Sequence, residues 1–350
     1  MGSADCIQLG LLFGPDALPK THSLSTIKHY FTTLHSLTSE DCATLPRATK
    51  VRRIVTGQAS GLTMQPTAGA GKMIKVTAIQ TGTVQIKAAQ ATGKPGRSAL
   101  GRKIDIFKDP KWLPPLPILA FLIEHPEGLF LIDTGDTAQN STPGYLPRWH
   151  PFFRYEVSVN VAPDEEIGVQ LDRLGIDCRK DLKAVILTHM HHDHAGGLHH
   201  FPHNRILVPR EGWRFADGLK GKLAACLPQR WPVWLRPELL DLNGPAVGPF
   251  PSTFSLTADK RVFLVPTPGH IAGHVSVIVR GDDLTYLVAA DATYTEDNLR
   301  NELVDGITYD PELSLRTLRA LKSFASEEPT IVLPSHDPDG PVRLMNRRTF

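Results

Sequence analysis

The stretch Thr188-His189-Met190-His191-His192-Asp193-His194-Ala195-Gly196-Gly197 gathers spaced histidines and a carboxylate directly after the apolar run 184–187. That run is short, branched and continuous, which is typical of a strand covered on both faces. Residues two apart on an extended backbone point to the same side, so His189 and His191 can hold one ion together. If the chain then turns into a helix, Asp193 and His194 project from its first turn toward a second ion. Imidazole and carboxylate ligands suit zinc, and also iron or manganese, so we expect a metal site where a buried strand ends.

Length and composition favour a protein that acts on small molecules. The 350 residues, 41% of them hydrophobic, can bury one large core or two smaller ones. The net charge of +2 comes from 38 basic and 36 acidic residues without a long run of one sign. We therefore expect no nucleic-acid partner and no membrane partner.

The cysteines and the first residues of the chain indicate the cellular compartment in which we expect the protein. The four cysteines are widely separated and form no C-x-x-C pair, which favours a reducing compartment. No apolar run approaches the roughly 20 residues that span a bilayer, and the first residues lack the basic region of an export signal. We expect a cytoplasmic protein.

The chain divides by composition near Met73. Residues 1–72 are rich in Ser and Thr, poor in acids, and end in Gly69-Ala70-Gly71. They are predicted to form a poorly ordered N-terminal extension with a short helix within 23–35, although a transit-like leader also fits the composition. At Met73 apolar and polar residues begin to alternate, as in strands. We expect residues 73–350 to form one catalytic domain.

Strands and helices are predicted to alternate after Met73, with two hairpins. The hairpins are 118–123 with 129–132, and 275–279 with 285–290, each joined by turn-favouring residues. Helices are expected at 163–174, 210–240 and 311–324, and long loops at 90–116 and 136–160. Further strands are expected at 74–79, 84–86, 184–187, 206–208, 262–265 and 330–333. This mixture indicates an α/β sandwich.

Four candidate ligands each follow an apolar strand: His189, His270, Asp291 and His336. Sites built at the carboxyl ends of strands converge in space. We expect one ion on His189, His191 and His270, a second on Asp193, His194 and His336, and Asp291 as a bridge between them. Two metals roughly 3.5–4 Å apart can hold a bridging hydroxide at neutral pH, because coordination lowers the pKa of bound water. Such a site supplies a nucleophile without a serine or cysteine.

These residues also carry a resemblance to a known family. The run from His189 to His194, with Asp133-Thr134-Gly135 before it and Pro268-Gly269-His270, Asp291 and His336 after it, resembles the metallo-β-lactamase superfamily over about residues 73–340. Within that superfamily, the segments 291–298 and 309–315 are similar to the N-acyl-homoserine lactonases, enzymes of quorum quenching.

The resemblance implies an αββα sandwich with two zinc ions per chain, with iron, manganese or cobalt as alternative metals. It implies that a metal-bridging hydroxide attacks the carbonyl of a small-molecule lactone. Tyr294, three residues after the bridging aspartate, would donate a hydrogen bond to the carbonyl or ring oxygen. Asp193 would pass a proton to the departing alkoxide. A homodimer is left open.

Other residues near the motif receive weaker expectations. The histidines His192, His199, His200 and His203 receive no ligand role and are expected at the surface, whereas His274 either supports a ligand or only packs. Asp133 is expected to organise the metal loop through hydrogen bonds. The aromatic residues Trp149, Phe152 and Phe153 suit either the core or an acyl pocket. The arginines near the end, Arg343, Arg347 and Arg348, are expected in a solvated tail.

Two other activities remain as alternatives on the same fold. A glyoxalase II-like thioesterase would want a basic helical region at its C-terminus, whereas this chain ends soon after His336. An iron-dependent redox enzyme, such as a persulfide dioxygenase, needs fewer ligands. The complete ligand set favours a hydrolase over both of these and over a non-catalytic binding protein.

Overall fold

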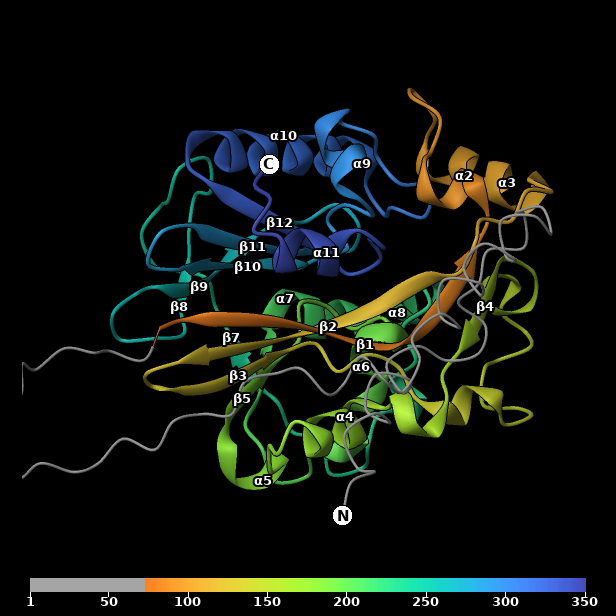
Figure 1. The fold of residues 1–350 in the computed structure, drawn as a ribbon. Helices are drawn as coiled ribbons and strands as arrows, with labels where there is room; N and C mark the ends of the chain where they lie inside the picture. Colours follow the sequence, from red (N-terminus) through yellow and green to blue (C-terminus); the bar gives the residue numbers. More distant parts are fainter. Residues whose placement is uncertain (1–72) are drawn as a thin grey trace, which may run out of the picture. The chain divides into compact units, whose positions relative to one another are not determined.

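The computed structural model describes residues 73–350; the extension and the helix predicted within 1–72 lie outside the described residues. Two mixed sheets face each other at the centre (Figure 1). The first has the order β4 (Val157–Asn160), β1 (Lys75–Ile86), β2 (Leu116–His125), β3 (Gly128–Ile132), β5 (Leu182–Ile186), β6 (Ile206–Pro209) and β7 (Glu238–Leu240). The second has the order β12 (Thr330–Pro334), β11 (Thr285–Ala290), β10 (Val275–Arg280), β9 (Val262–Pro266) and β8 (Phe254–Ser255).

Helices cover the outer face of each sheet (Figure 1). Those on the first sheet's side are α4 (Ile167–Arg173), α5 (Cys178–Asp181), α6 (His192–Ala195) and α7 (Arg210–Ala216); those on the second sheet's side are α9 (Glu296–Arg300) and α10 (Pro311–Glu327). The remaining helices are α2 (Ala88–Ala91), α3 (Ala99–Lys108), α8 (Leu219–Leu223) and α11 (Gly340–Met345). No helix among residues 73–350 has the length and apolar character needed to cross a membrane.

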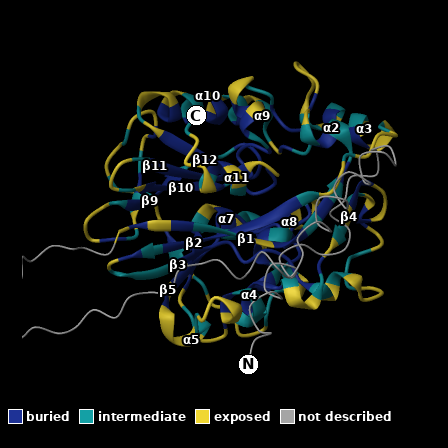
Figure 2. Ribbon diagram, viewed as in Figure 1, coloured by how far each residue is buried: buried dark blue, intermediate teal, exposed yellow. Residues whose placement is uncertain are grey.

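Alternation along the strands explains why the sheets are covered on both sides. Successive side chains of a strand point to opposite faces. Along β2, Phe121 belongs to the cluster between the sheets, whereas Leu122 packs in the cluster shared with α4 and α7. Along β12, Leu333 lies between the sheets, whereas Val332 belongs to the cluster shared with α10. Both sheets are consequently buried along most of their length (Figure 2), and the predicted αββα sandwich is confirmed.

Both predicted hairpins are confirmed. Strands β2 and β3 pair antiparallel, with Glu124 opposite Leu129, and β10 and β11 pair antiparallel, with Arg280 opposite Thr285. Strands β5 and β12 are paired in parallel with β3 and β11. Several strands therefore end at one edge of the sandwich, which is where the candidate ligands are found.

The prediction of two long loops, at 90–116 and 136–160, is wrong in part. The first contains α3, which begins where the Ser98 side chain accepts a hydrogen bond from the Gly101 backbone N–H and which buries Ile106 completely. Its glycines and prolines hide this short amphipathic pattern in the sequence. The second ends in β4, which pairs with β1 from Thr83 to Ile86. A four-residue strand at a sheet edge gives little local signal.

Two further expectations need correction. The helix predicted at 210–240 consists only of α7 and α8, because Gly218 separates them and Pro228 and Pro232 lack the N–H groups that a continuing helix needs. The end of the chain is not wholly a solvated tail, since α11 holds Arg343 with only 2% of its surface exposed. Its guanidinium pairs with Asp337 at 2.7 Å and with Glu296 at 3.0 Å, and these buried carboxylates are what allow an arginine there.

Candidate metal centre

The junction of β3 and β5 positions the histidine motif. Asp133 follows β3 with φ of +61°, a left-handed conformation that Asp and Asn tolerate better than most residues. Its two carboxylate oxygens accept hydrogen bonds from the Thr188 backbone N–H and the Thr188 hydroxyl, each at 2.8 Å. The hydrogen bonds predicted for Asp133 are confirmed. His189 is thereby held at the end of β5.

A first cluster contains three histidines and one aspartate. One ligand atom from each of His189, His191, His270 and Asp291 lies within 4.8 Å of all the others. His191 Nδ1 lies 3.0 Å from His189 Nε2 and 3.1 Å from His270 Nε2. All four side chains are buried. The structure thus brings together the three histidines assigned to the first ion, although His191 and His270 are 79 residues apart.

A second cluster lies on the other side of Asp291 and contains Asp193, His194 and His336. Asp291 Oδ1 is 3.2 Å from His194 Nε2, while its Oδ2 is 3.3 Å from His336 Nε2 and 3.6 Å from His270 Nε2. Asp193 Oδ2 is 3.4 Å from His336 Nε2. Asp291 therefore lies between the two clusters, in the position expected of a bridging ligand.

The hydrogen bonds around the clusters orient the ring nitrogens for metal binding. His194 Nδ1 donates to Asp133 Oδ2 at 2.8 Å, and His336 Nδ1 donates to the carbonyl of Pro117 at 2.9 Å. In a neutral ring, this leaves Nε2 as a lone pair directed into the site. Among residues 73–350, the buried atoms His194 Nε2 and Asp291 Oδ1 have no hydrogen-bond partner. Buried polar atoms are seldom left unpaired, so this nitrogen and oxygen donor set fits a divalent metal.

The pKa values of the histidines shift in opposite directions within the site: those of His189 and His191 are lowered, whereas those of His194, His336 and His270 are raised. Burial, and then His270, lowers the pKa of His191 to about 3, and burial with His194 lowers that of His189 well below its ordinary value. Burial acts in the same direction on two other rings, but Asp291 and its neighbours outweigh it and raise the pKa of His336 to about 10 and that of His194 well above 6.5. The carboxylates thus attract positive charge, which a metal ion supplies when it displaces these protons.

Tyr294 lines the same cavity as residues of both clusters. Its ring stacks on His336 with 5.5 Å between centroids, and its hydroxyl accepts a hydrogen bond from Gln90 Nε2 at 3.2 Å. Burial, together with Asp291 and Asp305, raises its pKa well above 10, so the phenol keeps its proton. The cavity is lined by Tyr294 together with His191, Asp193, His270, Asp291 and His336.

Sequence reasoning missed two residues of this region. Gln90 comes from α2 and Asp305 from the segment after α9, and neither belongs to a recognisable motif. Asp305 is buried, and its Oδ2 lies 3.6 Å from His270 Nδ1. A buried carboxylate facing the outer nitrogen of a histidine is a common support for a metal ligand. Only the tertiary structure reveals it.

A second, larger cavity of about 250 Å³ adjoins the clusters and shares His191 and His270 with them. Trp149 and Phe152 line it, whereas Phe153 packs in the core near β1 and β2. The aromatic segment therefore contributes both to the core, through Phe153, and to the wall of a cavity, through Trp149 and Phe152.

The remaining histidines differ in their burial. His192 is buried rather than at the surface, because its Nδ1 donates to Asp136 Oδ2 at 2.7 Å. His274 is also buried and lies 2.9 Å from the hydroxyl of Thr267. His203 is exposed, as expected, whereas His199 and His200 are partly buried beside Glu166.

Comparison with known proteins gives relatives along most of the described chain. The model of the metallo-beta-lactamase superfamily matches residues 113–336. An N-acyl homoserine lactonase of a Bacillus species is 30% identical over 225 residues, which cover 63% of this chain and 82% of the relative. The N-acyl homoserine lactonase AttM of Rhizobium radiobacter is 28% identical over 235 residues, which cover 64% of this chain and 83% of the relative.

Solved structures share the fold. An AiiA variant of Bacillus thuringiensis with N-decanoyl-L-homoserine at its active site superimposes with a TM-score of 0.62 at 24% identity, covering 77% of this chain and 95% of that chain. An N-acyl homoserine lactone hydrolase with its product N-hexanoyl-L-homoserine at the catalytic metal centre gives 0.60 at 23% identity with the same coverage.

Proposed function

This chain belongs to the metallo-β-lactamase superfamily and is a metal-dependent hydrolase, and on that premise we propose that it opens the lactone ring of N-acyl-homoserine lactones. The observation that carries the proposal is the common cavity of the two ligand clusters and the buried Tyr294 hydroxyl. The 30% identical relative is named for the same activity.

We propose zinc as the native metal, with two ions at this centre. One would be held by His189, His191 and His270, the other by Asp193, His194 and His336, with Asp291 as the shared ligand. When bound, the ions supply Lewis acidity that polarises the lactone carbonyl and lowers the pKa of the attacking water. Two of the seven, His194 and His336, already present Nε2 because their Nδ1 atoms donate elsewhere.

The chain's own side chains would position the substrate and move the proton. Tyr294 donates a hydrogen bond from its protonated hydroxyl to the carbonyl or ring oxygen, where negative charge develops. Asp193 stays ionised: without metal, His192, His336 and His194 hold its pKa far below its ordinary value despite burial, and a bound metal ion would supply the positive charge in place of the His336 and His194 protons. It takes a proton from the attacking water and delivers it to the ring oxygen as the bond from that oxygen to the carbonyl carbon breaks. The product is a hydroxy acid, whose ionisation releases one proton.

The cavity of about 250 Å³ beside the clusters would hold the acyl chain. It opens directly from His191 and His270, and Trp149 and Phe152 give it an apolar wall. Ligand sites of this kind bury apolar groups and use a few polar groups to fix orientation. The substrate's head would then lie at the clusters and its chain along this wall.

The test is a substrate panel with purified, zinc-loaded protein in a pH-stat. We expect proton release with N-acyl-homoserine lactones of several chain lengths, and little with thioesters or β-lactams. Hydrolysis of thioesters without hydrolysis of lactones would replace the proposal with the glyoxalase II-type alternative. Oxygen consumption with a persulfide by protein loaded with iron instead of zinc would support the iron-dependent alternative.

A further inference from the structure

A third cluster of metal-ligand atoms shares no residue with this site. Glu166 precedes α4, and His199 and His200 end the turn that follows α6. One ligand atom from each lies within 4.8 Å of the other two. Glu166 Oε2 is 3.0 Å from His199 Nε2 and 2.6 Å from His200 Nε2. Both rings thus aim a nitrogen at the same carboxylate oxygen.

The tautomer of His199 indicates that a positive charge is needed between these atoms. Its Nδ1 lies 3.2 Å from the carbonyl of Gly196 and donates its proton there. In a neutral ring, Nε2 is then an unprotonated acceptor that faces an acceptor oxygen of Glu166. Two lone pairs at 3.0 Å repel unless a proton or a metal ion lies between them.

A neutral His200 ring can donate its Nε2 proton to Glu166, so the positive charge is needed at His199 alone. The ring centroids of His199 and His200 are only 4.1 Å apart, so two imidazolium ions would repel. Burial, followed by the nearby His199, lowers the pKa of His200. Glu166 itself is an anion, because the Ala138 N–H and the His200 ring outweigh the effect of burial and lower its pKa. One compact divalent cation can instead bind the carboxylate oxygen of Glu166 and a nitrogen of each ring.

The three side chains have room to lie together and are partly accessible to solvent. The side chains of His199 and His200 are 35% and 22% exposed, and that of Glu166 only 10%, so the two histidines are partly open to solvent. A Cβ on Gly168 would come within 2.4 Å of His200 Nδ1, so the absence of a side chain there makes room for the ring. Three protein ligands leave a position for water.

We propose that Glu166, His199 and His200 form a third divalent-metal site, suited to zinc, that acts separately from the catalytic pair. Glu166 Oε1 also accepts hydrogen bonds from the Thr137 hydroxyl at 3.0 Å and the Ala138 N–H at 2.8 Å. The ion would therefore fasten the turn after α6 to the start of the segment that carries Trp149 and Phe152. Its role would be to hold these two segments together.

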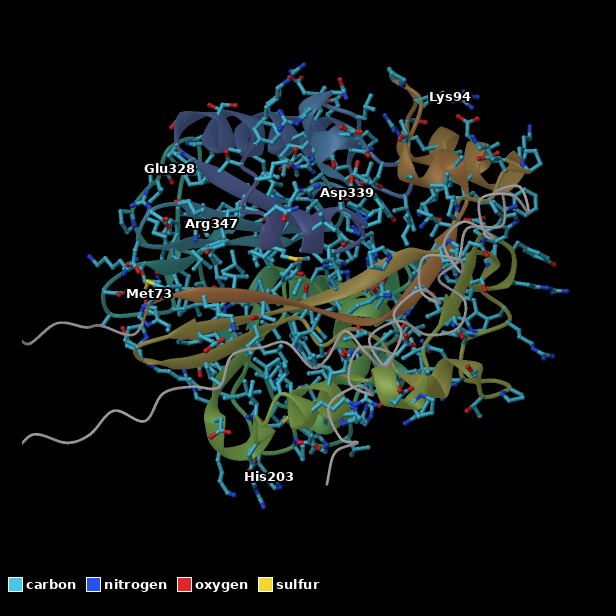
Figure 3. The ribbon with its side chains drawn as sticks, in the orientation of Figure 1. Met73, Lys94, His203, Glu328, Asp339 and Arg347 are labelled. Carbon is cyan, nitrogen blue, oxygen red and sulfur yellow. The ribbon has the colours of Figure 1, made fainter. Side chains whose placement is uncertain are left out.

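The test is a difference in bound zinc between variants of the full chain. Wild type, His200→Gln, Glu166→Gln and the control His203→Gln are dialysed against the same zinc buffer, and their zinc content is measured by mass spectrometry. His203 is exposed, and its label in Figure 3 lies at the edge of the described residues. We expect His200→Gln and Glu166→Gln to bind one equivalent less than wild type, and His203→Gln to bind the same.

The readout is the difference in bound zinc between each variant and wild type, not the total zinc per chain. If the catalytic site binds fewer than two ions, this difference still reports on the third site. Circular dichroism checks that each variant folds. Glu166→Gln keeps an amide oxygen for the Ala138 N–H, and His199→Gln replaces any variant that does not fold. Equal zinc in all folded variants would overturn the proposal and leave Glu166 as an acceptor for histidine N–H groups.

Discussion

Asp133→Asn tests how the chain holds a metal ligand in the correct tautomer. The substitution keeps the size of the side chain, and Asn tolerates the φ of +61° at this position. One oxygen can still accept from the Thr188 backbone N–H. The new NH₂ group, however, replaces the oxygen that accepts from His194 Nδ1 at 2.8 Å and from the Thr188 hydroxyl. Two donors would face each other, so His194 must move its proton to Nε2, the atom directed at the metal.

Loss of such a supporting acceptor weakens metal binding by about 10–100-fold, which corresponds to roughly 1.4–2.7 kcal/mol. Zinc affinity is measured by competition with a chromophoric chelator. Asp136→Asn is the matched control, because Asp136 makes the same kind of contact, at 2.7 Å, with His192, which is not a proposed ligand. We expect the zinc affinity of the control to stay within about threefold of wild type. A tenfold change in affinity corresponds to about 1.4 kcal/mol. Equal weakening in both variants, or in neither, would refute the tautomer argument.

Three further predictions concern catalysis, stability and domain boundaries. Tyr294→Phe should lower kcat for lactones about 100-fold, the usual cost of losing one such hydrogen-bond donor, with unchanged zinc content; unchanged turnover would remove Tyr294 from the mechanism. Arg343→Leu should lower the free energy of unfolding in urea by about 3–5 kcal/mol, because the carboxylates of Asp337 and Glu296 lose their buried guanidinium and only Glu296 keeps another cation, Arg300. The exposed Arg347→Leu should unfold like wild type, and equal unfolding of both would show that the buried network contributes little. A chain that begins at Met73 should keep its zinc content and turnover; loss of either would show that residues 1–72 belong to the catalytic domain.

The parts of the fold that follow strand periodicity could be predicted from the sequence. The apolar runs that become β5, β9, β11 and β12 are continuous because both faces of each strand are covered. Residues directly after these strands meet at one edge, which is why His189, His270, Asp291 and His336 could be grouped before any coordinates. Their role as ligands remains a prediction.

Other features depend on contacts that no local pattern reveals. Gln90 reaches Tyr294 across 204 residues, and Asp305 faces His270 from a segment without regular structure. Arg343 resembles a surface residue in sequence, and only the carboxylates of Asp337 and Glu296 make its burial favourable. His192 likewise becomes a buried residue because Asp136 accepts its proton. Polar side chains are the hardest to place from sequence, because their burial depends on a distant partner.

Anomalous diffraction at the zinc edge from crystals of the zinc-loaded protein tests the proposed catalytic centre most directly. The account predicts two peaks roughly 3.5–4 Å apart, one beside His189, His191 and His270, the other beside Asp193, His194 and His336, with Asp291 touching both. A single peak in this region, or two peaks that share no contact with Asp291, would contradict it.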